Sequence, residues 1–329
     1  MAAVLNFFDT YMLLAITEEI VPQQTFFKDR YFPTGANDIF RSDKVLTEYR
    51  KGDRKMAAFV SARAGDIPVD RRGYEIHEYQ PAFIAPSRLL TLDDLNKRGY
   101  GEAIYANSTP AMINNACTMQ TYIDDKTEGE TLYVKFFDDT SDHTYTVANK
   151  WNAENGDFFG DVRNMARLLS SRGLRAADLV MGVDVADALL EMDKVRELLN
   201  KNSGIIVGQI EQELSAYDGV AFMGILNFGG YKLNLISVDE TYVDDNNSTQ
   251  RYFPATSAMV TAPGCGHLMY GQITQIDHGS IDPVTYAAAR VPKFILDQPN
   301  DKRKLRLACR PLAAPHNYCP YIYAANVVG

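Results

Sequence analysis

The stretch from Leu46 to Tyr105 constrains the fold most, because it has extended character but too little apolar surface to form a core of its own. Its outgoing limb runs from Lys55 to Ala62, and a turn-rich tip follows from Gly65 to Gly73. The return limb begins at Tyr74 and alternates apolar and polar residues, as a half-buried strand does. The hairpin carries the basic residues Arg50, Lys51, Arg54, Lys55, Arg63, Arg71 and Arg72. We expect this hairpin to be either solvated or covered by another subunit.

Length, net charge and the lengths of apolar runs limit the class of protein. A chain of 329 residues can hold one large or two medium domains. Its formal net charge is -9, from 33 Lys plus Arg against 42 Asp plus Glu, which argues against sequence-specific DNA binding. No apolar run reaches the roughly 20 residues of a membrane span, and the first residues lack the basic region of a secretory signal. We therefore expect no membrane segment and no export.

The cysteines predict neither a disulfide framework nor a metal site. Cys117, Cys265, Cys309 and Cys319 are few and scattered, which favours a reducing cytosol. The nearest approach to a metal pattern is Cys309, His316 and Cys319, but the spacing fits no standard zinc signature and a fourth ligand is not evident.

The N-terminal segment is expected to be an arm. Phe8, Tyr11, Met12 and Ala15 have the spacing of one helix face. Residues 26–33 then place four aromatic residues in a short stretch, which we predict to be non-helical and to need a hydrophobic partner.

Beyond the hairpin, the pattern predicts an α+β fold. Helices are expected after the N-cap candidate Thr91, over 111–123, from Asp157 to near Gly173, and over one or two segments within 186–199. Strands are expected over 132–137, 143–147, 178–181, 220–226, 231–238, 257–261, 269–275 and 321–328. The first two strands should form an antiparallel hairpin, and 220–226 with 231–238 another, because Gly229 and Gly230 suit a tight turn.

A search for catalytic chemistry finds no candidate constellation. Gly264-Cys265-Gly266-His267 places a thiol near an imidazole, but the two glycines favour a loop and no third group orients the pair. The only tryptophan, Trp151, is interpreted as a buried ring that anchors the loop before a capped helix. We predict no enzyme, no catalytic residue, no cofactor and no metal.

The order of several short motifs resembles the major capsid protein E family of lambda-type tailed phages. Near the N-terminus the resemblance rests on 26–32, Phe59-Val60, 72–74, 81–86 and 90–95, with Arg98, Gly101 and Glu102. Further on it rests on Trp151, Gly173, 179–182, 252–254, Tyr270-Gly271 and 310–312. The match therefore extends over most of the chain.

The resemblance implies the phage Hong Kong 97 capsid fold and a division of the chain. The N-terminal arm would be 1–32, and the extended β-hairpin loop 46–90. The peripheral domain would be 33–45 with 91–165, and the axial domain 166–304. Residues 305–329 would be a C-terminal strand segment that returns to the peripheral domain. The family's long spine helix has only 111–126 available here, so either the spine is shortened or part of the natural chain is missing.

The implied function is that of a phage major capsid protein. Copies would self-assemble into pentamers and hexamers that form an icosahedral shell around double-stranded DNA, without sequence-specific binding. The implied location is the virion, after assembly in the host cytoplasm. Scaffold, decoration and portal proteins are further candidate partners. The alternative is another virion structural protein, such as a tail-tube or decoration protein. Inter-subunit contacts are expected at Phe26, Phe27, Phe59, Arg63, Arg71, Arg72, Tyr74 and Ile76.

Overall fold

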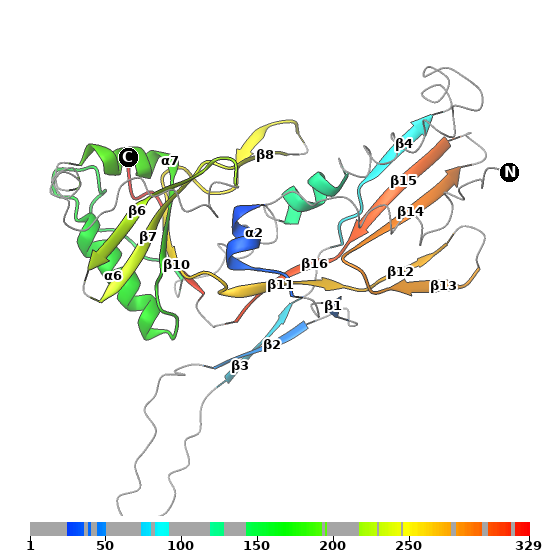
Figure 1. Ribbon diagram of the computed structural model, residues 1–329, viewed down its shortest axis with the longest axis horizontal. Helices are drawn as coiled ribbons and strands as arrows, with labels where there is room; N and C mark the ends of the chain where they lie inside the picture. Colours follow the sequence, from blue (N-terminus) through cyan, green and yellow to red (C-terminus); the bar gives the residue numbers. More distant parts are fainter. Residues whose placement is uncertain are drawn as a thin grey trace, which may run out of the picture.

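The computed structural model of this chain is an elongated molecule with two lobes and a projecting hairpin (Figure 1). Both helices and strands are present, which confirms the α+β class. The structure describes residues 25–35, 39–40, 45–50, 74–79, 83–91, 119–127, 143–192, 195, 217–228, 230–244, 246–277, 281–297, 302–316 and 320–329.

The first lobe is built on a five-stranded sheet in the order β17-β10-β5-β7-β6. Only the β5–β7 pairing is parallel, and the other three neighbours pair antiparallel. The strands are β5 (Asp178–Gly182), β6 (Val220–Phe228), β7 (Tyr231–Val238), β10 (Ala258–Thr261) and β17 (Tyr321–Ala324). β5 is buried along its whole length because both faces of the sheet are covered.

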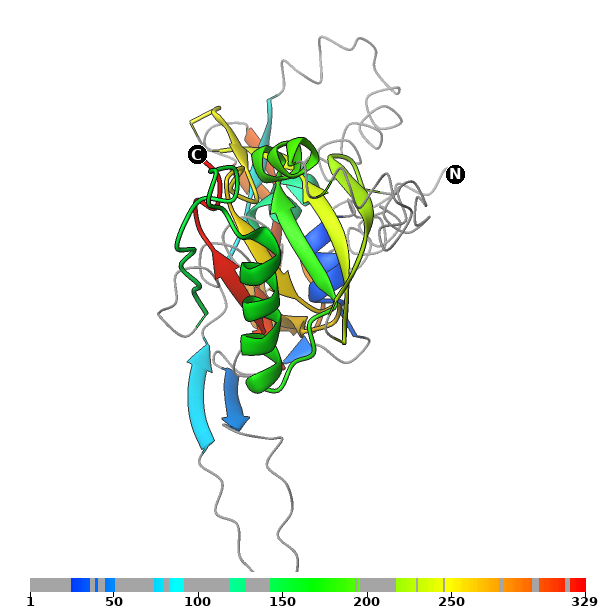
Figure 2. The ribbon, with the colours of Figure 1, turned by 90° about the vertical axis from the view of Figure 1, so that its left-hand side faces the viewer.

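Helix α6 (Phe158–Ser171) covers one face of this sheet, as Figure 2 shows. Its buried residues, Phe158, Val162, Met165, Ala166 and Leu169, recur at helical spacing, so the helix expected between Asp157 and Gly173 is confirmed. Asp157 is the N-cap, and its side chain accepts a hydrogen bond from the Gly160 amide at 3.1 Å.

Trp151 anchors the segment in front of α6. Its ring is 2% exposed, packs edge to face on Phe158 at 5.0 Å between centroids, and donates Nε1–H to Asp161 Oδ2 at 2.9 Å. The interpretation of Trp151 as a buried anchor is therefore confirmed.

Helix α7 (Val183–Glu191) follows β5 without a loop. In its first turn, the amides of Asp184 and Val185 donate to the carbonyl of Ala255. Gly182 permits this close approach, because a Cβ there would lie 2.3 Å from the backbone oxygens of Pro254 and Ala255. This confirms the first of the one or two helical segments expected within 186–199.

The β6–β7 hairpin is also confirmed, with a tighter turn than expected. β6 continues through Phe228, which pairs with Tyr231, so the connection is Gly229-Gly230. Gly230 has φ +88°, a backbone conformation that glycine adopts without steric cost.

The second lobe consists of smaller sheets in the orders β14-β15-β4, β1-β11-β16 and β12-β13, together with the helical residues 119–127. Its strands are β1 (Ile39–Phe40), β4 (Ser87–Thr91), β11 (Gly266–Gly271), β12 (Ile273–Ile276), β13 (Pro283–Tyr286), β14 (Arg290–Asp297), β15 (Lys302–Cys309) and β16 (Pro311–Pro315). A short hairpin, β8 (Thr241–Val243) with β9 (Thr249–Arg251), follows β7.

Several predicted elements differ from the structure. The strand expected over 269–275 is two strands, because β11 pairs with β16 whereas β12 pairs with β13 in another sheet. The C-terminal strand ends at Ala324, before Asn326 takes φ +52°. Thr91 is the last residue of β4, and the helix expected after it lies outside the described residues. Residues 119–127 are helical, which confirms the C-terminal part of the helix expected over 111–123.

The strand expected over 143–147 is wrong. Thr144 makes only an isolated parallel bridge with Tyr323. The amide of Tyr145 donates to the Tyr323 carbonyl, and the Tyr323 amide donates to the His143 carbonyl, so the segment follows the free edge of β17. Its expected partner, 132–137, lies outside the described residues.

The projecting hairpin is formed by β2 (Val45–Arg50) and β3 (Tyr74–Tyr79), which pair antiparallel from Val45↔Tyr79 to Arg50↔Tyr74. Both views show it extending away from the lobes (Figures 1 and 2). The paired base of the hairpin is confirmed, while the limb 55–62 and the tip 65–73 lie outside the described residues. Within the described residues, no helix is long and apolar enough to cross a membrane.

The Asp157 cap gives a direct test of how α6 is held. Asp157→Ala should lower the free energy of unfolding by about 1 kcal/mol, because the Gly160 amide loses its acceptor. Asp157→Asn is the matched control and should retain most of the stability, since asparagine also caps well. Urea denaturation of the unassembled chain measures both variants, and equal losses would contradict this role for the cap.

Candidate junction and assembly site

Helix α2 (Phe26–Tyr31) lies between the two lobes (Figure 1). The prediction that this stretch is non-helical is wrong. A helix of six residues has little stability by itself, so tertiary packing must hold it. The surroundings of its side chains provide that packing.

The aromatic side chains of α2 are buried in the chain's own core. Phe26 is 0% exposed and Phe27 4% exposed. Phe27 stacks on Phe253 at 6.0 Å, and Phe26 meets Tyr217 edge to face at 5.6 Å between centroids. The same cluster contains Val180, Ile236 and Met259 of the first lobe and Leu305 and Leu307 of the second. The hydrophobic partner expected for this stretch is therefore found within the same chain.

Asp178 ties α2 to the first lobe. Its carboxylate, 0% exposed, accepts from Arg30 Nε at 2.7 Å and from Arg30 Nη2 at 3.1 Å, a bidentate pair. Tyr31 Oη donates to it at 3.0 Å, and Asn234 Nδ2 on β7 donates at 2.8 Å. Burial, followed by the charge of Asp178, raises the pKa of Tyr31 well above its ordinary value, which keeps the hydroxyl as a donor. Four donors thus compensate one buried carboxylate.

Asp124 ties α2 to the second lobe. Its Oδ1 accepts from Lys28 Nζ at 3.1 Å and also from Arg290 Nη2 on β14. Asp124 is 1% exposed, and among the described residues its Oδ2 has no partner. Lys28 and Arg30, two residues apart on α2, therefore bind carboxylates on opposite sides of the junction.

The loop before β11 closes over the end of α2. The Gly264 amide donates to the Arg30 carbonyl at 2.9 Å, and Cys265 Sγ donates to the Tyr31 carbonyl at 3.7 Å. Phe32 packs on Gly266, where a Cβ would lie 2.4 Å from its ring. The loop interpretation is right for Gly264 and Cys265 but wrong for Gly266 and His267, which begin β11.

The cysteine chemistry at this junction is suppressed by burial. Desolvation raises the pKa of Cys265 to about 12 and that of Cys309 to about 12, so both thiols stay protonated near neutral pH. His267 instead contacts His316, with 3.3 Å between ring nitrogens. Across the described part of the chain, no three His, Cys, Asp or Glu residues gather as a metal site would require. Cys319 lies outside that part.

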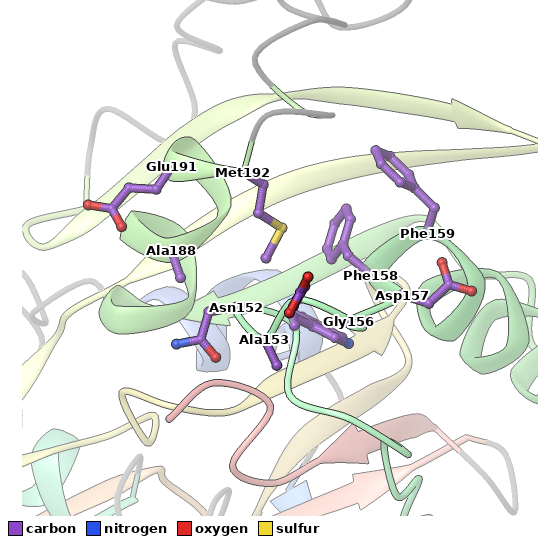
Figure 3. Close-up of a pocket in the computed structure, with 11 residues that line it drawn as sticks. Asn152, Ala153, Gly156, Asp157, Phe158, Phe159, Ala188, Glu191 and Met192 are labelled. Carbon is purple, nitrogen blue, oxygen red and sulfur yellow. The ribbon is translucent and has the colours of Figure 1, made fainter.

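A cavity of about 400 Å³ lies on the first lobe, away from α2. Figure 3 shows Met192 and Phe158 facing one another across it, while Glu191 extends away. The Trp151 N–H is already bound to Asp161, so that ring offers no free donor here. The lining residues are Trp151, Asn152, Ala153, Glu154, Gly156, Asp157, Phe158, Phe159, Ala188, Glu191 and Met192.

The structure describes only some of the residues that the sequence predicts to make inter-subunit contacts. Phe26 and Phe27 pack within the chain, and almost none of their surface remains for a neighbour. Tyr74 and Ile76 occupy β3, opposite Arg50 and Glu48 of β2. Phe59, Arg63, Arg71 and Arg72 lie outside the described residues. Sequence reasoning missed Asp178 and Asn234, although an aspartate at the start of an otherwise apolar strand is itself an unusual signal.

The sequence matches a family model described as phage major capsid protein E, over residues 9–120 and 111–324. A search of curated proteins finds no match. Solved structures with a similar fold include the following two. A proposed prophage capsid protein from Escherichia coli CFT073 has a TM-score of 0.62 at 15% identity, over 96% of this chain and 98% of that one. A phage-related protein from Bordetella bronchiseptica RB50 has a TM-score of 0.52 at 11% identity, over 96% and 97%.

The Asp178 network predicts a large loss on substitution. Asp178→Asn should cost about 3 to 5 kcal/mol of unfolding free energy, because Arg30, with a side chain only 12% exposed, loses its anion. The control is Asp239→Asn, which breaks the Arg251–Asp239 pair at the surface, where the side chains are 48% and 45% exposed. That change should cost less than about 1 kcal/mol. Denaturation midpoints measure both, and similar losses would refute a special role for Asp178.

Proposed function

The chain belongs to the phage major capsid protein E family, and from this premise we propose how its copies are joined into a shell. The protein has the Hong Kong 97 type of capsid fold, as the resemblance implied. Its role is that of a shell-forming structural protein of the virion. Copies self-assemble into pentamers and hexamers that close into an icosahedral shell around the double-stranded genome.

The projecting β2–β3 hairpin is the observation that carries the assembly proposal. Among the described strands, β2 and β3 hydrogen-bond only to each other, so the hairpin is not part of either lobe's sheets. A two-stranded ribbon has little stability without further packing. A neighbouring copy supplies that packing, and the hairpin engages it through Tyr74, Ile76, Phe59, Arg63, Arg71 and Arg72. Repeated weak contacts of this kind add up to high avidity in a closed assembly.

We propose that the two lobes correspond to the axial and peripheral domains. The pairing of β17 with β10, in the sheet that contains β5, supports an axial domain of 143–192, 217–261 and 320–329. The pairing of β11 to β16 among themselves and with β1 and β4 supports including 266–316 in the peripheral domain. The extended loop then ends before Ile84, which bridges Cys309. The N-terminal arm reaches to about Phe32, with α2 as its anchored end.

The remaining partners follow from the same role. The shell is assembled in the host cytoplasm and encloses DNA without reading its sequence, and scaffold, portal and decoration proteins are its candidate partners. The protein acts without enzymatic chemistry. The raised pKa values of Cys265 and Cys309 support this, since a thiol with a pKa of about 12 stays protonated near neutral pH and is then a poor nucleophile.

Electron microscopy of the purified or coexpressed protein tests the shell. Polyhedral particles or hexameric rings are the expected result. Tubes would favour a tail-tube protein instead, and uniform monomers under all assembly conditions would contradict self-assembly.

Charge at the loop tip tests the inter-subunit contact. Arg71→Glu with Arg72→Glu should reduce the yield and the thermal stability of particles, because these side chains pair with acidic groups on an adjacent copy. Arg71→Lys with Arg72→Lys keeps both charges and should assemble nearly as the parent does. Particle yield by sedimentation and microscopy measures the effect, and unchanged particles after charge reversal would rule out this contact.

A further inference from the structure

Glu240 holds the first turn of α2 in an unusual way. It lies between β7 and β8, and its Oε1 accepts a hydrogen bond from the Phe26 amide at 3.3 Å. Its second oxygen, Oε2, is buried and has no hydrogen-bond partner within the described structure. An ionised carboxylate in that position would leave one charged oxygen without compensation.

The charges around Glu240 oppose its ionisation. Asp29 on α2 and Asp218 in the turn before β6 both act on it with negative charge. The basic residues on the neighbouring elements bind other carboxylates: Lys28 binds Asp124, Arg30 binds Asp178 and Arg251 binds Asp239. Tyr252, whose amide donates to the Glu240 carbonyl, donates its hydroxyl to Asp125 Oδ1 at 2.8 Å, and its ring stacks on Tyr242 of β8. Among the described residues, no cationic side chain is therefore paired with Glu240.

We propose that Glu240 is a proton-controlled latch: when protonated it holds α2 in the junction between the lobes, and when it loses its proton α2 is released. When Glu240 is protonated, its Oε1 still accepts the hydrogen bond from the Phe26 amide. The neutral carboxyl also removes the repulsion from Asp29 and Asp218. Deprotonation restores both the repulsion and an unsolvated charge.

The relevant pH range follows from the same contacts. Burial, and then the charges of Asp29 and Asp218, raise the pKa of Glu240 from 4.5 to about 7, although the Phe26 amide acts in the opposite direction. A carboxyl whose pKa is raised in the folded state stabilises that state fully below its ordinary pKa, and the benefit is lost as the pH rises towards the folded value. Docking of α2 should therefore weaken between about pH 4.5 and 7 and change little above that.

Release of α2 would affect the junction as a whole. α2 carries both Arg30, bound to the first lobe, and Lys28, bound to the second, so the ion pairs across the junction depend on its position. The latch therefore goes beyond shell formation itself, because it makes the connection between the lobes sensitive to protons. It is a property of the single chain and can be measured without assembly.

Hydrogen exchange followed by mass spectrometry tests the latch on the full unassembled chain. After correction for intrinsic exchange, protection of the amides of residues 27–32 should fall about tenfold between about pH 5.5 and 7 and change little above that. A peptide from α6 serves as the internal reference and should keep its protection. Glu240→Gln mimics the protonated carboxyl and should remove the pH dependence while keeping α2 protected. The latch is refuted if Glu240→Gln retains the pH dependence of the parent, or if the parent has none.

The neighbouring carboxylates supply an independent test. Asp218→Asn removes one repelling charge and should move the midpoint of the transition to lower pH. Asp239→Asn is the matched control, since that carboxylate binds Arg251, and it should leave the midpoint in place. Equal midpoints in both variants would contradict the latch. Particle formation is scored separately, so loss of the latch with normal shells, or normal latch behaviour without shells, distinguishes this inference from the proposed function.

Discussion

The buried carboxylate of Asp178 is the interaction on which the arrangement of the lobes depends. A charge in the middle of a protein is costly unless its hydrogen-bonding capacity is used, and here Arg30, Tyr31 and Asn234 use it. Two of these three residues lie on α2 and one on β7, so the carboxylate is satisfied only when the helix is docked. An apolar contact would tolerate sliding, whereas these directed bonds fix one position of α2.

The elements that could be predicted from the sequence are those determined by local pattern. The buried face of α6 is evident from the spacing of Phe158, Val162, Met165 and Leu169, and two consecutive glycines in the sequence indicate the β6–β7 turn. Trp151 could be interpreted correctly because a single large ring before a capped helix is most often buried. In each case the information lies within about one helix or one hairpin.

The junction could not be predicted, because its partners are far apart in the sequence. Arg30 meets Asp178 across 148 positions, and Lys28 meets Asp124 across 96. α2 is too short for a periodic signal, so nothing local distinguishes it from an extended arm. The same limit explains the segment 143–147, whose residues favour a strand but whose pairing was decided by the free edge of β17. The strands β15, β16 and β17 likewise join three different sheets, which no local pattern within 305–329 indicates.

The position of β17 at the edge of the five-stranded sheet affects when the first lobe can finish folding. Residues 320–329 are synthesised after every other strand of the five-stranded sheet, yet β17 forms one edge of that sheet, to which α2 is tied. The Val327 carbonyl also accepts a hydrogen bond from the Trp151 amide. Helix α2 and the earlier strands are synthesised before β17 and must wait for this closure. Folding that joins both ends in this way is slow compared with local pairing. A nascent copy therefore completes its five-stranded sheet only after β17 has been synthesised, and a chain that terminates before residue 320 lacks the strand that finishes its first lobe.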